Sequence, residues 1–109
     1  MTEIARINDA FRARVFKSSQ PDGKVAMTHG IAALGKLTAA YLCYLIESFN
    51  DFPEGNDPYG EHDFGVIMLK DGTKVYWKID YYEDAEMEFG TEDKANAYRV
   101  LVIMLAEEY

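Results

Sequence analysis

The sequence has very few of the residues that build covalent or metal-based supports. Its single cysteine, Cys43, excludes an intramolecular disulfide and a cysteine-based zinc site. No apolar run approaches the ~18 residues that a membrane-spanning helix needs. The first residues lack the basic stretch followed by an apolar stretch that marks a secretory signal. We therefore expect a protein of the reducing cytoplasm with no membrane partner.

Motifs that hold nucleotides or cofactors are also missing. The glycine-bounded segment 30–35 lacks the Lys and Ser/Thr of a phosphate loop, and no G-x-G-x-x-G occurs. We predict no cofactor. What the chain does have is apolar content: 49% of its 109 residues are hydrophobic and 14% are aromatic, which is enough for one packed core. We expect a single domain spanning residues 1–109.

Positive charge is scarce, and the negative charge is concentrated in one part of the chain. The formal net charge is −8, and residues 47–93 alone carry −11, with fourteen acids against three lysines. An acidic field repels the phosphate backbone, so direct nucleic-acid binding is not expected. The same field attracts a basic protein surface, including one that normally holds nucleic acid. Solubility alone also accounts for such a charge.

Apolar periodicity predicts helices at both ends of the chain and one between them. Thr2 is a helix cap, and Ile4, Ile7, Phe11 and Val15 recur at helical spacing after it. A second helical pattern begins at Leu37. A third helix is predicted at 92–107, because Thr91 followed by two acids favours a helix start before the apolar run 100–106. Residues 24–28 alternate in polarity and predict a short strand.

The strongest local signal is a β-hairpin around Asp71-Gly72. A two-residue loop there places Val66 opposite Trp77 and, one step outward, Asp63 opposite Asp80. We therefore predict an α+β fold: a small antiparallel sheet built on the 64–82 hairpin plus a short strand near 24–28, covered by about three helices (3–17, 37–51 and 92–107). The helices should cover the Val66/Trp77 face.

The turn-rich segment 56–65 is the candidate site. Two carboxylates facing each other need a proton, a cation or a donor between them. We expect one of three arrangements: a bound cation, a Lys, Arg or Tyr hydroxyl that reaches in, or backbone amides of the 56–61 turn that donate to Asp63. The third makes the segment a structural clamp. The clamp residues are then Asn56, Asp57, His62, Asp63 and Trp77. The metal alternative uses Asp57, Glu61, His62, Asp63 and Asp80.

Exposed tyrosines among acids are typical of protein interfaces. The interaction residues predicted on this ground are Tyr59, Glu61, Tyr76, Asp80, Tyr82, Glu83, Asp84, Glu86 and Glu88. No catalytic residue is predicted. His29 and His62 each follow a strand boundary, where a lone histidine more often bonds a backbone group than acts as a base. Cys43 lies among apolar residues and fits packing.

Five segments carry a family resemblance: 5–9, 28–34, 56–65, 75–82 and 99–109. With them the chain resembles the domain-of-unknown-function family 3768, small proteins of proteobacteria often carried on plasmids, phages and integrated elements. The resemblance implies no assigned activity, so no catalytic residue is carried over from it. The mobile-element association implies a role against host defence, such as the inhibition of a CRISPR or restriction complex.

Together these observations favour a non-enzymatic, acidic protein-interaction module of a mobile genetic element. The narrower expectation is an anti-CRISPR or anti-restriction inhibitor that occupies the basic, nucleic-acid-binding surface of its target. The alternative is a small enzyme or a divalent-metal-binding domain that uses the 57–63 turn and Asp80. A homodimer is left open.

Overall fold

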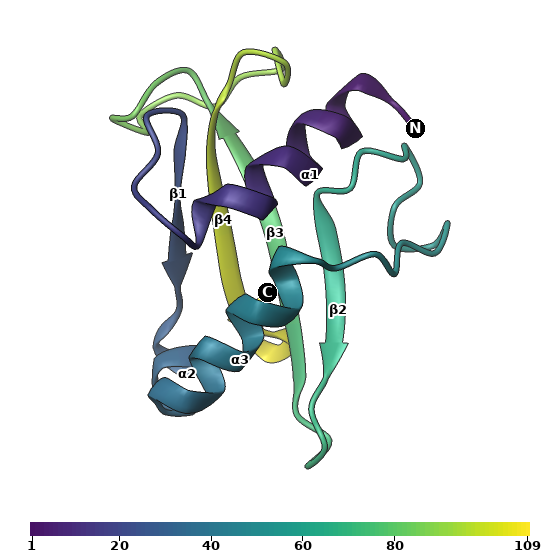
Figure 1. Cartoon of the computed structure of the whole chain (residues 1–109), viewed down its shortest axis with the longest axis vertical. Coiled ribbons are helices and arrows are strands. Elements are labelled where there is room, and N and C mark those ends of the chain that lie inside the picture. The colour runs from purple at the N-terminus through teal and green to yellow at the C-terminus, as the bar shows by residue number, and fades with distance from the viewer.

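The computed structural model describes all residues, 1–109, and shows an α+β fold (Figure 1). The elements are α1 (Glu3–Val15), β1 (Gly23–Met27), α2 (His29–Ala32), α3 (Lys36–Glu47), β2 (Phe64–Met68), β3 (Lys74–Tyr82), β4 (Tyr98–Leu105) and a 3-10 turn, η1 (Ala106–Glu108). The strand order is β1-β4-β3-β2. Because β1 runs parallel to β4, the sheet is mixed and not purely antiparallel as predicted.

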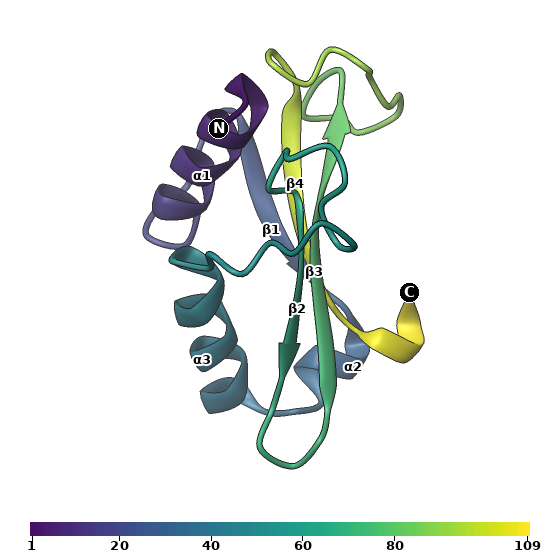
Figure 2. The ribbon, with the colours of Figure 1, turned by 90° about the vertical axis from the view of Figure 1, so that its right-hand side faces the viewer.

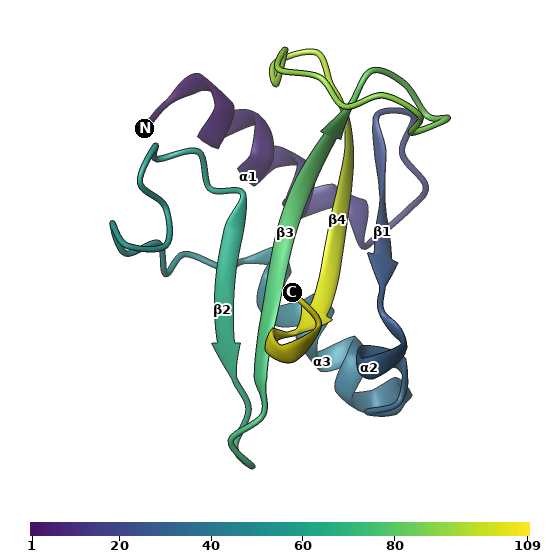
Figure 3. The same cartoon turned by 180° about the vertical axis from the view of Figure 1, so that it is seen from behind.

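The helices α1 and α3 lie on one face of the sheet (Figure 2). Between the two layers is a core in which α1 and α3 each bury apolar side chains against β3 and β4. Its members include Phe11, Val15, Leu42, Ile46, Val75, Trp77, Ile79, Leu101 and Ile103. Over the other face only the short C-terminal turn η1 crosses the strands (Figure 3). We call this second side the open face.

The first two predicted helices are confirmed with small changes of their ends. The hydroxyl of Thr2 accepts the amide of Ala5 at 3.0 Å and starts α1. The helix ends at Val15, before the predicted 17. The other helix, predicted at 37–51, runs from Lys36 to Glu47 after Gly35, whose φ of 95° few other residues adopt. No helix is both long enough and apolar enough to cross a membrane.

The hairpin forms where predicted, but its register is shifted by one residue. The loop has three residues, 70–72, because the amide of Leu69 bonds the carbonyl of Thr73 at 2.9 Å and Gly72 has φ 89°. Trp77 therefore pairs with Gly65 and not with Val66. A one-residue slip exchanges the two faces of a strand. Val66 lies on the open face, and Gly65 and Ile67 face the helices beside Trp77.

The predicted helix at 92–107 is wrong. Residues 98–105 form β4, a central strand between β1 and β3. A strand that is buried on both faces has a continuous apolar sequence and not an alternating one, and Val100, Leu101, Ile103 and Met104 are all buried. The hydroxyl of Thr91 accepts the amide of Asp93 at 3.1 Å in a tight turn and does not start a helix.

Candidate functional site

The connection between α3 and β2, residues 48–63, is closed by the carboxylate of Asp57. Its Oδ1 accepts the amides of Glu61 at 2.9 Å and of His62 at 3.3 Å. Asp57 is buried, so these bonds replace water around its charge. We call residues 51–63 the clamp loop. The predicted amide donors are present, but they donate to Asp57 and not to Asp63.

His62 joins the clamp loop to α1. Its φ of 55° is unusual for a residue with a side chain, and its ring stacks on Phe52 with centroids 4.0 Å apart. The ring nitrogen Nδ1 lies 2.9 Å from Asp9 on α1. The same carboxylate is 2.5 Å from Arg12. The Asp9 carboxylate therefore bonds both the imidazole of His62 and the guanidinium of Arg12.

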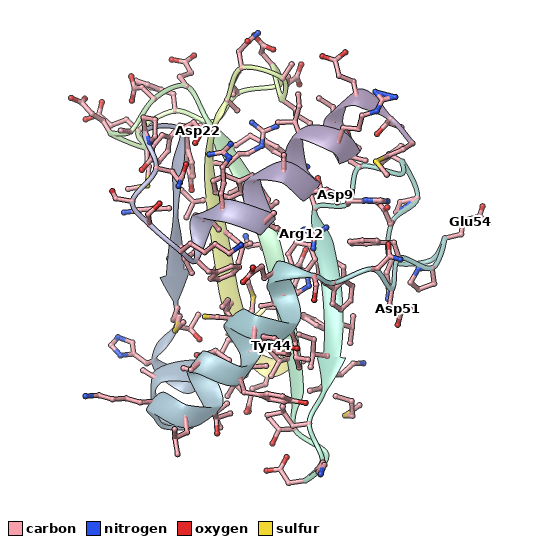
Figure 4. The ribbon with its side chains drawn as sticks, viewed as in Figure 1. Asp9, Arg12, Asp22, Tyr44, Asp51 and Glu54 are labelled. Carbon is pink, nitrogen blue, oxygen red and sulfur yellow. The ribbon has the colours of Figure 1, made fainter.

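Arg12 is buried, and its guanidinium satisfies the end of α3. Nη1 donates to the carbonyl of Ile46 at 2.9 Å and to that of Phe49 at 3.0 Å. These carbonyls lie at the C-terminus of the helix, where backbone acceptors lack helical partners. The guanidinium also lies 5.1 Å from the Trp77 ring centroid. Arg12 and Asp9 project from α1 toward α3 and the clamp loop (Figure 4).

A second buried network connects α1 to β3 and β4. Asn8 donates to the hydroxyl of Tyr81 at 2.8 Å and to the carbonyl of Glu61 at 3.0 Å. Its own carbonyl oxygen accepts Nε of Arg99 at 2.7 Å. The Tyr81 hydroxyl in turn donates to Asp63 at 2.9 Å. Every polar group of Asn8 is therefore used in holding other elements together.

Burial sets the protonation of this network. It raises the pKa of the Tyr81 hydroxyl, and the neighbouring Asp63 carboxylate raises it further, so the hydroxyl keeps its proton and acts as a donor. Burial also raises the pKa of the Asp63 carboxyl, although the bond from Tyr81 opposes this shift. Of the three arrangements expected for Asp63, the structure shows the second, a tyrosine hydroxyl that reaches in.

The predicted pairing of Asp63 with Asp80 is wrong. Asp63 faces Ile79, whose amide donates to the Asp63 carbonyl at 2.9 Å. Asp80 lies on the open face with its carboxylate 3.0 Å from Lys78. The shifted register causes this change, because it moves Asp80 to the side opposite the Tyr81 network.

The residues of the metal alternative consequently do not come together as one set of ligands. No group of three His, Cys, Asp or Glu side chains anywhere in the chain is placed to hold a metal ion. Asn56 joins the clamp loop through its amide, which donates to the carbonyl of Pro53 at 2.9 Å. Asn56, Asp63 and Asp80 are among the residues that line a hollow of about 390 Å³. Two residues considered for catalysis, His29 and Cys43, lie outside this loop. His29 is exposed on α2. Burial raises the pKa of the Cys43 thiol, which disfavours a reactive thiolate.

The second feature is the connection between β3 and β4, where residues 83–93 form what we call the acidic loop. It lies at one end of the sheet (Figure 1). Its six acids are all exposed, and none belongs to an ion pair. They are Glu83, Asp84, Glu86, Glu88, Glu92 and Asp93. Phe89 lies among them with 65% of its surface exposed.

Backbone hydrogen bonds keep the acidic loop in one shape. The amide of Glu83 donates to the carbonyl of Phe89 at 2.9 Å, and the amide of Thr91 donates to that of Tyr81 at 3.1 Å. Beyond the loop, Arg99 donates to the carbonyls of Ala97, at 3.3 Å, and Lys94. The Lys94 ammonium lies 2.7 Å from Glu61, which connects this end to the clamp loop.

The predicted interaction residues do not form one surface. Four of them, Glu83, Asp84, Glu86 and Glu88, belong to the acidic loop, and Tyr82 leads into it. Tyr76 and Asp80 lie on the open face, where the Tyr76 ring is 5.1 Å from that of Phe64 and 5.6 Å from that of Tyr109. On the clamp loop, Tyr59 is 80% exposed and Glu61 is paired with Lys94.

Sequence reasoning missed three buried polar residues: Asn8, Arg12 and Arg99. Each had a signal. Asn8 falls on the apolar stripe of α1, between Ile4 and Phe11, where a polar side chain must find a buried partner. Arg99 begins the apolar run of β4, where a charged side chain also needs buried partners. The sequence does not show that Asn8 and Arg99 bond each other, because they are 91 residues apart.

Comparison with protein families matches residues 27–108 to the family model described as protein of unknown function (DUF3768). The match covers α2, α3, the clamp loop, the acidic loop and all of β2, β3 and β4. No curated protein and no solved structure matches the chain. The chain therefore belongs to the DUF3768 family of proteins of unknown function.

Proposed function

We propose that this protein is a non-enzymatic interaction module that binds a basic protein surface through its acidic loop. One observation carries the proposal: six exposed carboxylates without ion-pair partners and an exposed phenylalanine belong to the same ordered loop. Several acids elsewhere in the chain are compensated by a basic side chain. Asp9, Asp22, Glu47, Glu61 and Asp80 each lie within an ion pair. Unpaired acids also occur singly or in twos elsewhere, but the acidic loop holds the densest group of them, so the negative field is strongest there.

The loop has the two features that an interface of this kind uses. The carboxylates steer a basic partner and set its orientation. Phe89 supplies an apolar anchor, and aromatic anchors at the centre of an interface contribute most of the binding free energy. Because the loop is already ordered by its own hydrogen bonds, less conformational entropy is lost on binding.

The chemistry of such a partner is that of a protein groove that holds nucleic acid, with Lys and Arg spaced along an apolar floor. We extend the proposal accordingly: the module belongs to a mobile genetic element, acts in the cytoplasm and inhibits a host-defence complex, of the CRISPR or restriction kind, by occupying that groove. The resemblance to family 3768 and the acidic loop both support this extension.

The experiment compares two variants with equal changes of charge. In the first, Glu83, Glu86 and Glu88 are replaced by Gln. In the second, Asp51→Asn, Glu54→Gln and Glu107→Gln remove three acids that are equally exposed and unpaired but lie outside the loop. Each protein is immobilised, partners are captured from a lysate of its native host, and the captured partner is purified for titration.

We expect the control variant to retain the partner and the loop variant to lose it, with association that slows as salt is raised. Double-stranded nucleic acid added in excess should displace the protein from its partner. Equal binding by both variants would show that the acidic loop is not the contact surface. Binding that salt and nucleic acid leave unchanged would exclude the occupation of a basic groove.

A further inference from the structure

The outer edge of β2 presents backbone groups that nothing in the chain binds. The bonds from Leu69 to Thr73 and from Ile79 to Asp63 fix the alternation of the antiparallel pair. Odd-numbered residues of β2 bond inward to β3. The amides and carbonyls of Phe64, Val66 and Met68 therefore point outward, and none of them appears in any other hydrogen bond of the chain.

This edge lacks the devices that keep strand edges from pairing. Residues 64–69 contain no charge and no proline, and no bulge interrupts their register with β3. Only the upper end is obstructed. The clamp loop passes around it, from Phe52 against the Trp77 ring on the helix side to Asn56 beside Phe64 on the open face. The free portion of the edge is therefore centred on Ile67.

Apolar surface adjoins this free portion. A cavity of about 590 Å³ separates α3 from the end of β2, and Tyr41, Leu45, Met68 and Leu69 contribute to its walls. On α3 the apolar surface continues from Tyr41 to Leu37 and Tyr44, at helical spacing. Leu37 is 89% exposed and Tyr44 is 69% exposed. Single exposed apolar residues are common, but a contiguous group beside an open strand edge indicates an interface.

We propose that a second copy of this chain covers the edge, with the two β2 strands antiparallel about a two-fold axis at Ile67. Val66 of each copy then faces Met68 of the other. Because both residues point their amide and carbonyl outward, this register forms four backbone hydrogen bonds and joins the two sheets into one of eight strands. The cavity beside α3 in each copy then lies at one end of the paired strands, so Tyr41 and Leu69 of each copy flank the new contact.

Charge favours the same chain as the occupant. In the antiparallel arrangement the hairpin tip of one copy, where the exposed Lys70 and Lys74 outnumber the exposed Asp71, reaches the clamp loop of the other. Asp51 and Glu54 project there from the side of β2 (Figure 4) and have no ion-pair partner. The acidic loop lies at the opposite end of the sheet from the hairpin tip (Figure 1). Antiparallel pairing therefore places the two acidic loops at opposite ends of the dimer, where their repulsion is screened.

The test is the oligomeric state by analytical ultracentrifugation over a range of concentrations. We expect wild type to sediment as a dimer, at twice 12.4 kDa. Met68→Lys adds a charge to the edge, and Val66→Pro removes an outward amide without breaking a bond to β3. Each should weaken dimerisation by about tenfold or more. The matched control is Met27→Lys on β1, the other edge strand, where the methionine is also exposed and the dimer should persist.

Hydrogen exchange gives an independent readout. The amides of Val66 and Met68 should become protected as concentration rises, while the folded state is unchanged. A wild-type protein that stays monomeric at about 0.1 mM would overturn the proposal. So would a dimer that survives both edge variants and dissociates only when Tyr41 and Tyr44 are replaced by Asp. Loss of partner binding in the acidic-loop variant leaves the dimer intact, so this inference and the proposed function fail separately.

Discussion

Substitution of Gly65 by alanine tests the register of the hairpin directly. Gly65 lies opposite Trp77, and a Cβ at position 65 would meet Cε2 of the indole at 2.6 Å and the ring of Phe49 at 2.8 Å. Trp77 is fully buried and cannot move aside, because Phe49 and Phe52 pack against it with ring centroids 5.4 and 6.1 Å away. Overpacking of this kind costs about 1–3 kcal/mol.

The backbone effect has the opposite sign. Glycine in a strand interior is less favourable than alanine by about 0.5–1 kcal/mol. The net prediction for Gly65→Ala is a loss of about 1–2 kcal/mol in the free energy of unfolding, measured by urea denaturation with circular dichroism. Gly55→Ala is the control, since a Cβ at position 55 meets no atom within 4 Å. Its stability should change by less than about 0.5 kcal/mol.

A double-mutant cycle identifies the cause. With Trp77→Phe the indole edge is absent, so Gly65→Ala should cost less in that background, with a coupling of about 0.5–3 kcal/mol. In the register that a two-residue loop would impose, Gly65 faces Lys78 on the open face, and alanine there would be neutral or stabilising. A Gly65→Ala protein as stable as wild type would therefore refute the observed register.

Further predictions concern the buried network. Arg12→Ala should lower the free energy of unfolding by about 3–5 kcal/mol, measured by urea denaturation, because it leaves two carbonyls at the end of α3 without donors. Asn8→Leu should lower the free energy of unfolding by about 1–3 kcal/mol, because the Tyr81 hydroxyl loses the hydrogen bond that Asn8 donates. Faster exchange of the Tyr81 hydroxyl proton, measured by NMR, should accompany this loss. The contributions of Asp63 and Asp22 to the free energy of unfolding should change in opposite directions with pH. Burial raises the folded-state pKa of Asp63 above its unfolded value of about 3.9, so its contribution is present below that value and is lost as pH rises through the folded pKa. Wild type should gain stability relative to Asp63→Asn on acidification. Hydrogen bonds from Arg14 lower the folded-state pKa of Asp22, so its contribution to stability is present above about pH 3.9 and is lost as pH falls through the folded pKa. Wild type should therefore lose stability relative to Asp22→Asn on acidification. Unfolding curves from about pH 7 to 3 that shift in the same direction for both pairs of proteins would contradict these assignments.

The sequence predicts those elements whose pattern has only one interpretation. The stripe of α1 and its Thr2 cap give a helix, and Asp71-Gly72 gives a hairpin. The register was not predictable from apolar alternation, because β2 has apolar side chains on both faces: Phe64, Val66 and Met68 on one and Ile67 on the other. Gly65 was the available signal, since a strand glycine often marks a close approach by another group.

Residues 98–105 show a different limit. A continuous apolar run suits a buried helix and a central strand equally well. What decides between them is the neighbours, and β1 and β3 are both available to pair with this segment on either side. The β-branched residues Val100, Val102 and Ile103 favour a strand, whereas the acids after Thr91 favour a helix start. The local cap signal was outweighed by pairing that only the complete sheet provides.

The candidate site was divided in the same way. The acidic loop was predictable from the local excess of acids, because exposed carboxylates need no partner elsewhere in the chain. The clamp loop could be located but not explained, since its partners Asn8 and Asp9 lie on α1, 53 residues from Glu61 and His62. Long-range polar contacts leave no periodic trace in a sequence. Buried polar residues in apolar stripes are the trace that remains.

The two networks have a common consequence for binding. Arg99 bonds the carbonyls that follow the acidic loop, and its other contact, Asn8, holds Tyr81, whose carbonyl accepts the amide of Thr91. Both ends of the loop are thus fixed by residues in the protein interior. A fixed loop displays its carboxylates in one arrangement, which favours partners whose basic groups match that arrangement and excludes those whose groups do not. Under the proposed function, the buried polar residues, although remote from solvent, would determine which basic surface the exposed acids recognise.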